Sequence, residues 1–214
     1  MTRYVMVADL RKCVGCQTCT IACKHANGTP PGVQWRWVLD VEAGEYPDVT
    51  RSFVPVGCQH CARPPCMYVC PTTATRRRPD GIVTIDYTLC IGCGYCIVAC
   101  PYQARSKTTH LEFAYGDAPM ANESARMDFG RVGVATKCTF CADRIDAANG
   151  QRPGLDPEVT PACVNSCIAN ALHFGDTDDP ESNVSNILRE NEHFRMHEEL
   201  GAEPGFYYLW DKKP

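Results

Sequence analysis

The decisive stretch of the sequence is residues 90–101, which read CIGCGYCIVACP. Its cysteines have the spacing C-x2-C-x2-C-x3-C, and a proline follows the last of them. Gly92 and Gly94 lie between the first three cysteines, where glycine lets the backbone turn tightly. Three thiolates on one tight loop can hold one face of a compact inorganic core, and the fourth can reach a neighbouring core from the segment that follows.

The rest of the chain repeats this arrangement, since its 214 residues contain 16 cysteines and none falls outside a group of four. The four groups are Cys13, Cys16, Cys19 and Cys23; Cys58, Cys61, Cys66 and Cys70; Cys90, Cys93, Cys96 and Cys100; and Cys138, Cys141, Cys163 and Cys167. The third group matches the bacterial ferredoxin pattern without a mismatch. With four thiolates to each cluster, the count predicts four [4Fe–4S] clusters.

The pairing of the groups follows from their positions in the chain. In two-cluster ferredoxins the last cysteine of each run binds the other cluster. Groups two and three are close in sequence and should form one pair, which leaves groups one and four to pair across the chain. The expected ligand sets are Cys13, Cys16, Cys19 and Cys167; Cys138, Cys141, Cys163 and Cys23; Cys58, Cys61, Cys66 and Cys100; and Cys90, Cys93, Cys96 and Cys70.

Three other uses of the cysteines stay open. Structural zinc would use the C-x2-C pairs but has no use for a further cysteine three residues on. An even number of cysteines also allows a disulfide framework, although no secretory signal accompanies it. A mixed case, in which one group is degenerate or binds zinc, concerns the fourth group because 21 residues separate its two halves.

The predicted fold is α+β and loop-rich, with two bacterial-ferredoxin-like modules of two clusters each. The outer module comprises residues 1–50 and 106–214 with a C-terminal extension, and the inserted central module comprises residues 51–105. We expect short strands at residues 4–8, 53–56, 82–85, 171–174 and 206–210, a surface insertion at 106–137, and a helix at 185–200 capped by Ser185 or Asn186.

Composition limits the classes of function. The 44% hydrophobic fraction includes cysteine, so apolar residues are few for this length and clusters should supply much of the stability. A net charge of −4 gives no footprint for nucleic acid. No apolar run is long enough to span a bilayer, and we recognise no export signal at the start of the sequence.

Charged residues beside the cysteines could serve the clusters or a partner, or could simply be solvated. Lys12 and Lys137 each precede the first cysteine of a group, where they could raise a cluster potential, help to bind a partner or simply be solvated. The arginines of residues 76–78 could meet an acidic partner, but a solvated turn is the simpler interpretation.

Histidines and tryptophans near the groups are expected to be structural. His25 and His60 could donate hydrogen bonds near a cluster or act as proton-linked groups, although simple packing is favoured because thiolates complete the coordination. Trp35 and Trp37 are expected in the core or an interface. No Ser, His and Asp grouping suggests catalysis, so we expect no substrate site and no enzyme activity in this chain alone.

The sequence resembles the four-cluster iron–sulfur subunits of molybdopterin oxidoreductases of the dimethyl sulfoxide reductase family, over nearly the whole chain. The resemblance rests on residues 9–16 (DLRKCVGC), 58–66 (CQHCARPPC), 90–101, 137–141 (KCTFC) and 161–163 (PAC). The interrupted fourth group is its specific part, and the length is most similar to the polysulfide, thiosulfate, arsenate and nitrite-linked members. Ile168 departs from the pattern, because many relatives have proline after this cysteine.

The resemblance implies an electron-transfer subunit. Its partners would be a large catalytic subunit, which alone would hold the molybdopterin with molybdenum or tungsten, and a membrane anchor that handles quinone. Such a complex would be peripheral to the membrane, on the periplasmic face through co-export with the partner, or else cytoplasmic. The alternatives are a polyferredoxin-like carrier and the electron-transfer subunit of a hydrogenase or formate–hydrogen complex.

Overall fold

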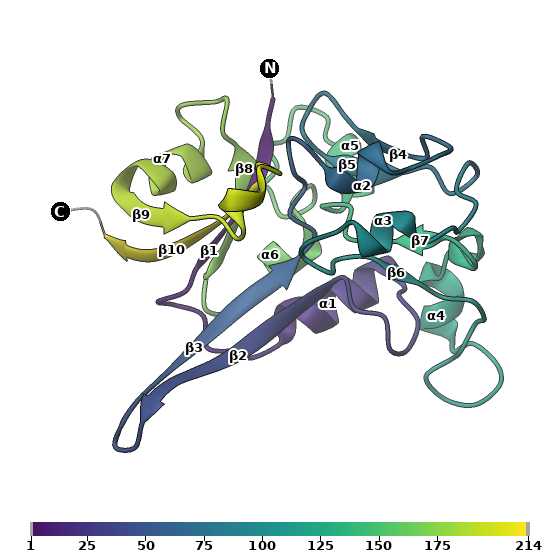
Figure 1. Cartoon of the computed structure of the whole chain (residues 1–214), viewed down its shortest axis with the longest axis horizontal. Coiled ribbons are helices and arrows are strands. Elements are labelled where there is room, and N and C mark those ends of the chain that lie inside the picture. The colour runs from purple at the N-terminus through teal and green to yellow at the C-terminus, as the bar shows by residue number, and fades with distance from the viewer. Residues whose placement is uncertain (1, 213–214) are drawn as a thin grey trace.

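The computed structural model describes the backbone of residues 2–212 and the side chains of residues 2–210 (Figure 1). The strands are β1 (Tyr4–Asp9), β2 (Arg36–Glu45), β3 (Asp48–Gly57), β4 (Thr75–Arg77), β5 (Val83–Ile85), β6 (Ser106–Lys107), β7 (Ala135–Thr136), β8 (Leu172–Asp176), β9 (Asn191–Phe194) and β10 (Phe206–Lys212). The helices are α1 (Thr18–Asn27), α2 (Pro65–Tyr68), α3 (Tyr95–Val98), α4 (Ala121–Arg126), α5 (Ala142–Asp146), α6 (Ala162–Asn165) and α7 (Asn183–Glu190). The fold is mixed α and β and rich in loops, as expected.

A four-stranded sheet joins the two ends of the chain, with strand order β8-β1-β10-β9. Strand β1 is parallel to β10 and antiparallel to β8, and all its residues from Val5 to Asp9 are buried. Because alternate side chains point to opposite faces, Val5 and Val7 pack with Val184 of α7, while Met6 and Ala8 face the cysteine-rich core. The sheet therefore has apolar contacts on both faces.

The pairing of β1 with β8 brings the first and fourth cysteine groups together. Ala8 lies opposite Leu172, and the Asp9 amide donates to the Ala171 carbonyl at 2.7 Å. The first group follows β1 directly and the fourth group ends just before β8. Helices α1 and α6 continue this contact, because they pack against each other beside the sheet (Figure 1).

The second and third groups have a similar arrangement on the other side of the molecule. The short helices α2 and α3 carry Cys66 and Cys96 and pack against each other. Strand β4 pairs with β5 between the two groups, so that the chain turns back toward its starting point. Figure 1 shows these elements above β6 and β7, away from the terminal sheet.

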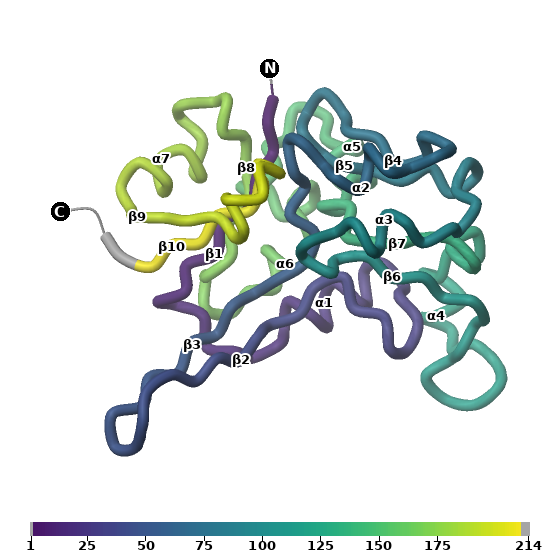
Figure 2. The backbone as a smooth tube through the Cα atoms, in the orientation of Figure 1, coloured from purple at the N-terminus to yellow at the C-terminus, as the bar shows by residue number. Residues whose placement is uncertain are grey.

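A long hairpin of β2 and β3 projects from the body, as the backbone tube in Figure 2 shows. Its inner end is buried, with Arg36 opposite Gly57, and its outer half is exposed. The strand predicted at residues 53–56 is the inner end of this hairpin. The segment predicted as a surface insertion, residues 106–137, is mostly exposed and contains α4, but it returns through the β6–β7 pair and its last four residues, 134–137, are buried.

The helix prediction for residues 185–200 was wrong in its bounds and its cap. Helix α7 begins at Asn183, after Ser182, whose hydroxyl accepts the Ser185 amide at 3.2 Å. It ends at Glu190 because the next residues form β9 and pair with β10. The strands predicted at 4–8, 82–85, 171–174 and 206–210 are confirmed, with shifts of a residue or two at their ends.

Candidate metal centres

The loops between cysteines have the backbone conformation that turns amide groups inward. Gly92 and Gly94 have φ of 66° and 82°, and Gly15 in the first group has 68°. A side chain at Gly92 would place its Cβ 2.0 Å from the Gly133 carbonyl oxygen, so only glycine fits there. Successive amides in such turns form concave sites that attract anions.

The first predicted ligand set is brought together by the sheet. Burial raises the pKa of Cys13, and the neighbouring thiols of Cys167 and Cys16 raise it further. Cys19 interacts in the same way with Cys13 and Cys167. Cys167, from the fourth sequence group, therefore acts on Cys13 and Cys19 of the first.

The second predicted set forms around Cys23, one helical turn beyond Cys19 on α1. Burial raises the pKa of Cys23 well above its usual value, and the thiols of Cys138, Cys163 and Cys141 raise it further. The pKa of Cys141 is raised to about 12 by burial and by Cys163 and Cys138. Cysteines from opposite halves of the chain thus form one compact group of thiols.

The third predicted set includes Cys66 of α2. Burial raises the pKa of Cys61, and Cys58, Cys66 and Cys100 raise it further. Cys100 comes from the third sequence group, as the crossover predicts. The Arg105 guanidinium donates to Cys66 Sγ at 3.0 Å.

The fourth predicted set is less directly connected. Cys90 and Cys96 lie in one apolar cluster with Ile85 and Ile97. Cys70 follows α2 directly, and α2 packs on both β4 and α3, the helix that carries Cys96. Its sulfur lies 3.8 Å from the Thr72 hydroxyl, and with the Thr75 amide this helps to lower the pKa of Cys70 although burial opposes the change.

Exposure differs sharply between the sets. Cys16 in the first set and Cys93 in the fourth are exposed. Every cysteine of the second set is buried, and in the third only Cys100 is partly exposed. The first and fourth sets therefore reach the surface, while the second is buried and the third nearly so.

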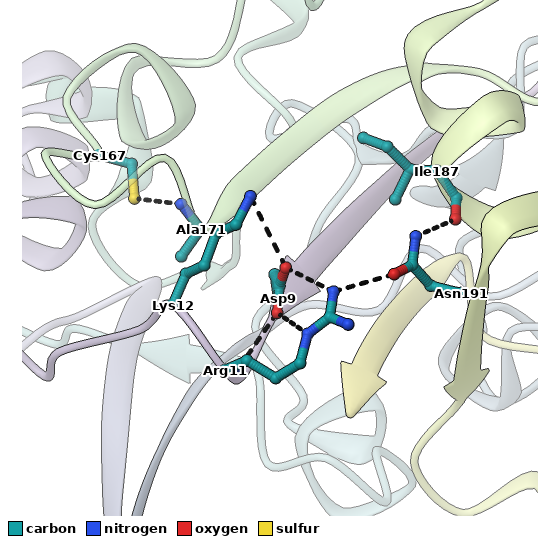
Figure 3. Close-up of polar contacts among 7 residues, drawn as sticks. All are labelled: Asp9, Arg11, Lys12, Cys167, Ala171, Ile187 and Asn191. Atoms are coloured by element: carbon teal, nitrogen blue, oxygen red, sulfur yellow. Dashed lines mark hydrogen bonds and ion pairs between the residues drawn. The ribbon is translucent and has the colours of Figure 1, made fainter. Parts of the chain in front are cut away.

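The donor groups suit iron–sulfur clusters. Thiols of the first three predicted sets act on one another, and amide groups point at sulfur. Phe140 N–H lies 3.4 Å from Cys138 Sγ. Ala171 N–H lies 3.2 Å from Cys167 Sγ, the contact drawn in Figure 3. All sixteen cysteines are free of disulfide bonds. Among the described residues, no three His, Cys, Asp or Glu side chains form a group that could hold a single metal ion.

Three buried cations lie beside the thiols, and sequence analysis named Lys137 but missed Arg36 and Arg105. Arg36 and Arg105 are 0% and 6% exposed, and Lys137 is 1% exposed. Lys137 Nζ donates to the carbonyls of Val83 and Cys138, which rules out the solvated interpretation. Arg36 lies between Trp35 and Trp37 in the sequence, and an arginine inside an apolar segment before a strand was the signal that could have revealed it.

His60 is a packed, neutral histidine. It is 3% exposed, stacks on Phe140 with ring centroids 3.6 Å apart, and accepts the Val83 amide at Nδ1. Burial lowers its pKa well below the usual value, and the nearby charges of Lys137, Arg36 and Arg105 lower it further. The packing interpretation is confirmed for His60, and Trp35 is buried as expected.

The surface cations form ordinary ion pairs. In Figure 3 the Arg11 guanidinium donates two hydrogen bonds, each 2.8 Å long, to the buried carboxylate of Asp9. Lys12 Nζ lies 3.8 Å from the same carboxylate. This network fixes the backbone directly before Cys13, the first cysteine of group one. Arg78 pairs with Asp80 at 2.7 Å and with Asp146 of α5 at 2.6 Å, so it is not free for a partner.

Comparison with known proteins places this arrangement in a class. Residues 49–115 match the family described as a 4Fe-4S dicluster domain. A selenate reductase subunit of Mesobacillus selenatarsenatis is 40% identical over 97% of this chain and 72% of its own length. A putative dimethyl sulfoxide reductase iron-sulfur subunit of Halobacterium salinarum is 39% identical over 98% of this chain and 79% of its own. A sulfite dehydrogenase subunit of Allochromatium vinosum is 37% identical over the whole of this chain and 85% of its own.

The chain is thus an iron–sulfur protein of the ferredoxin-like class. It belongs to the family of iron–sulfur electron-transfer subunits of molybdopterin oxidoreductases, as the sequence resemblance indicated. Such a subunit is not an enzyme by itself but a part of a larger oxidoreductase complex.

Proposed function

We propose that the chain relays single electrons through four [4Fe–4S] clusters, held by the four crossed ligand sets. These are Cys13, Cys16, Cys19 and Cys167 (cluster A); Cys23, Cys138, Cys141 and Cys163 (cluster B); Cys58, Cys61, Cys66 and Cys100 (cluster C); and Cys70, Cys90, Cys93 and Cys96 (cluster D). Clusters A and B belong to an outer module of residues 1–50 and 106–214, and C and D to a central module of residues 51–105. When bound, the clusters supply one-electron redox chemistry, and the protein fixes their order and surroundings.

The observation that carries this proposal is the crossing of thiols between groups. Cys167 acts on Cys13, and Cys23 acts on Cys138, Cys163 and Cys141. If each sequence group bound its own zinc ion or formed its own disulfides, Cys23 would have no reason to lie with the fourth group.

The contacts between sets support the linear order A–B–C–D. Cys19 and Cys23 lie one turn apart on α1, which connects A to B. Cys58 acts electrostatically on Cys138, which connects B to C. Helices α2 and α3 pack together with Cys66 and Cys96, which connects C to D. The exposed cysteines, Cys16 and Cys93, then belong to the two end clusters, where electrons would enter and leave.

The partners follow from this order and from the family. One end would meet a large molybdenum- or tungsten-bearing catalytic subunit, and the other a quinone-linked membrane anchor. No helix among the described residues has the length and apolar character needed to cross a membrane. We place the complex peripherally on a membrane, on the periplasmic face by co-export with the catalytic subunit.

Isolation of the native complex tests the function. The tagged chain, purified without oxygen, should contain about sixteen irons and bring with it a large subunit containing molybdenum or tungsten. A nickel–iron subunit in its place would indicate a hydrogenase complex. Isolation without any large partner would indicate a free polyferredoxin-like carrier, and zinc in place of iron would refute the cluster assignment.

A further inference from the structure

Arg36 is a buried cation without an acidic partner. Its side chain is 0% exposed, and no carboxylate in residues 2–210 forms an ion pair with it. Nη2 lies 2.9 Å from Met6 Sδ, the guanidinium lies 4.8 Å from the centre of the Phe206 ring, and Nε and Nη1 have no hydrogen-bond partner there. A guanidinium stays charged in proteins, and burying that charge is costly unless an anion compensates it.

The cysteines beside Arg36 belong to two ligand sets, because Met6 and Phe206, which contact its guanidinium, lie in one buried cluster with Cys19, Cys23, Cys138 and Cys163. The thiols that act on it are Cys163 and Cys138 of cluster B, Cys19 of cluster A, and Cys23 of cluster B. Arg36 begins β2 opposite Gly57 of β3, where a Cβ would lie 2.6 Å from the Trp35 carbonyl oxygen, so the two strands approach closely beside the guanidinium. The hairpin base thus inserts one positive charge where clusters A and B meet.

Arg105 occupies the corresponding place between clusters C and D. It is 6% exposed, and it donates to Cys66 Sγ at 3.0 Å and to the Thr75 hydroxyl at 3.1 Å. The thiols that act on it are Cys66 and Cys58 of cluster C and Cys96 of cluster D. Lys137 differs from both arginines, because two backbone carbonyls satisfy its ammonium group.

We propose that Arg36 and Arg105 are fixed internal cations, each at the junction of two clusters, and that each raises the reduction potentials of the pair it separates. The inference rests on the proposed four-cluster relay. Adding an electron to a cluster that already carries about −2 is easier beside a positive charge. At an effective dielectric constant of about 20, a unit charge within about 12 Å changes the reduction equilibrium about tenfold, which is about 59 mV for one electron.

The test is a redox titration of the purified complex followed by EPR, with signals assigned from alanine variants of one cysteine in each set. Arg36→Met should make reduction of clusters A and B about tenfold less favourable and move C and D less. Arg105→Met should show the reverse selectivity. Arg36→Lys keeps the charge and should restore most of the shift. Arg51→Met is the matched control on the same hairpin, since Arg51 is exposed and paired with Asp40, and it should change no potential.

Iron analysis separates this inference from the relay itself. A parent protein with far fewer than about sixteen irons would refute the relay. A parent with four clusters whose fully loaded Arg36→Met and Arg105→Met variants keep their potentials, or shift all clusters equally, would overturn the inference alone. One neutral variant could lose its iron while the lysine variant at the same position keeps its iron and shows shifted potentials. The methionine variant of the other arginine then tests the inference. Loss of iron in both neutral variants would also overturn the inference, because a structural role would then suffice.

Discussion

The crossing of Cys23 from the first sequence group to the fourth can be tested by counting iron in single and double variants. Cys23 and Cys19 lie on the same helix, four residues apart, and are 5% and 7% exposed. The thiols that act on Cys23 are those of Cys138, Cys163 and Cys141. Cys19 interacts electrostatically with Cys13 and Cys167, and also with Cys163 of the neighbouring set. Two equally buried residues on one helix are therefore assigned to different clusters.

The expected numbers follow from this assignment. Each alanine variant should lose one cluster and keep about twelve of about sixteen irons. Cys23→Ala combined with Cys138→Ala should still keep about twelve, because both changes affect cluster B. Cys23→Ala combined with Cys19→Ala should keep about eight, because two clusters lose a ligand. Iron is measured on protein purified without oxygen, and EPR identifies the missing signal.

The opposite pattern would refute the crossed assignment. If the pair Cys23 and Cys19 kept about twelve irons and the pair Cys23 and Cys138 only about eight, each sequence group would hold its own cluster. Non-additivity is informative here because residues that serve one unit fail together, while independent sites add.

Three further outcomes are expected. Removing iron with a chelator should abolish the cooperative thermal transition, because the small apolar core leaves cluster binding to supply much of the stability, and a native-like melt of the iron-free chain would contradict this. Gly92→Ala should destabilise the protein by about 1–3 kcal/mol and reduce iron in cluster D, because its Cβ would lie 2.0 Å from a carbonyl oxygen. The control is Gly116→Ala, at φ 77° with nothing within 4 Å of the new Cβ, which should show only the smaller backbone strain. Equal melting temperatures of the two variants would refute the steric argument. Asp9→Asn should lower stability by about 2 kcal/mol and weaken cluster A, because it breaks a buried charge-assisted contact with Arg11, whereas Asp40→Asn on the exposed hairpin should change the melting temperature little.

The sequence by itself determined the chemistry of this protein. Cysteine spacing set the cofactor class because ligands on one tight loop are local in sequence, and the run at residues 90–101 needs nothing distant to be recognised. The short strands beside the groups were predictable for the same reason, since alternation and turn residues act over a few positions. Helix α7 was misplaced because its end depends on β9 pairing with β10, which is a contact between segments.

Only the tertiary structure decided which charges enter the core. The apolar neighbours of Arg36 hint that it is buried, but the sequence does not show which thiols it meets, because they come from α1 and from the fourth cysteine group. Burial of the guanidinium requires the sheet, the hairpin base and the paired helices to close around it together. A local pattern therefore specified the ligands, while the electrostatic surroundings of the ligands depend on contacts between distant parts of the chain.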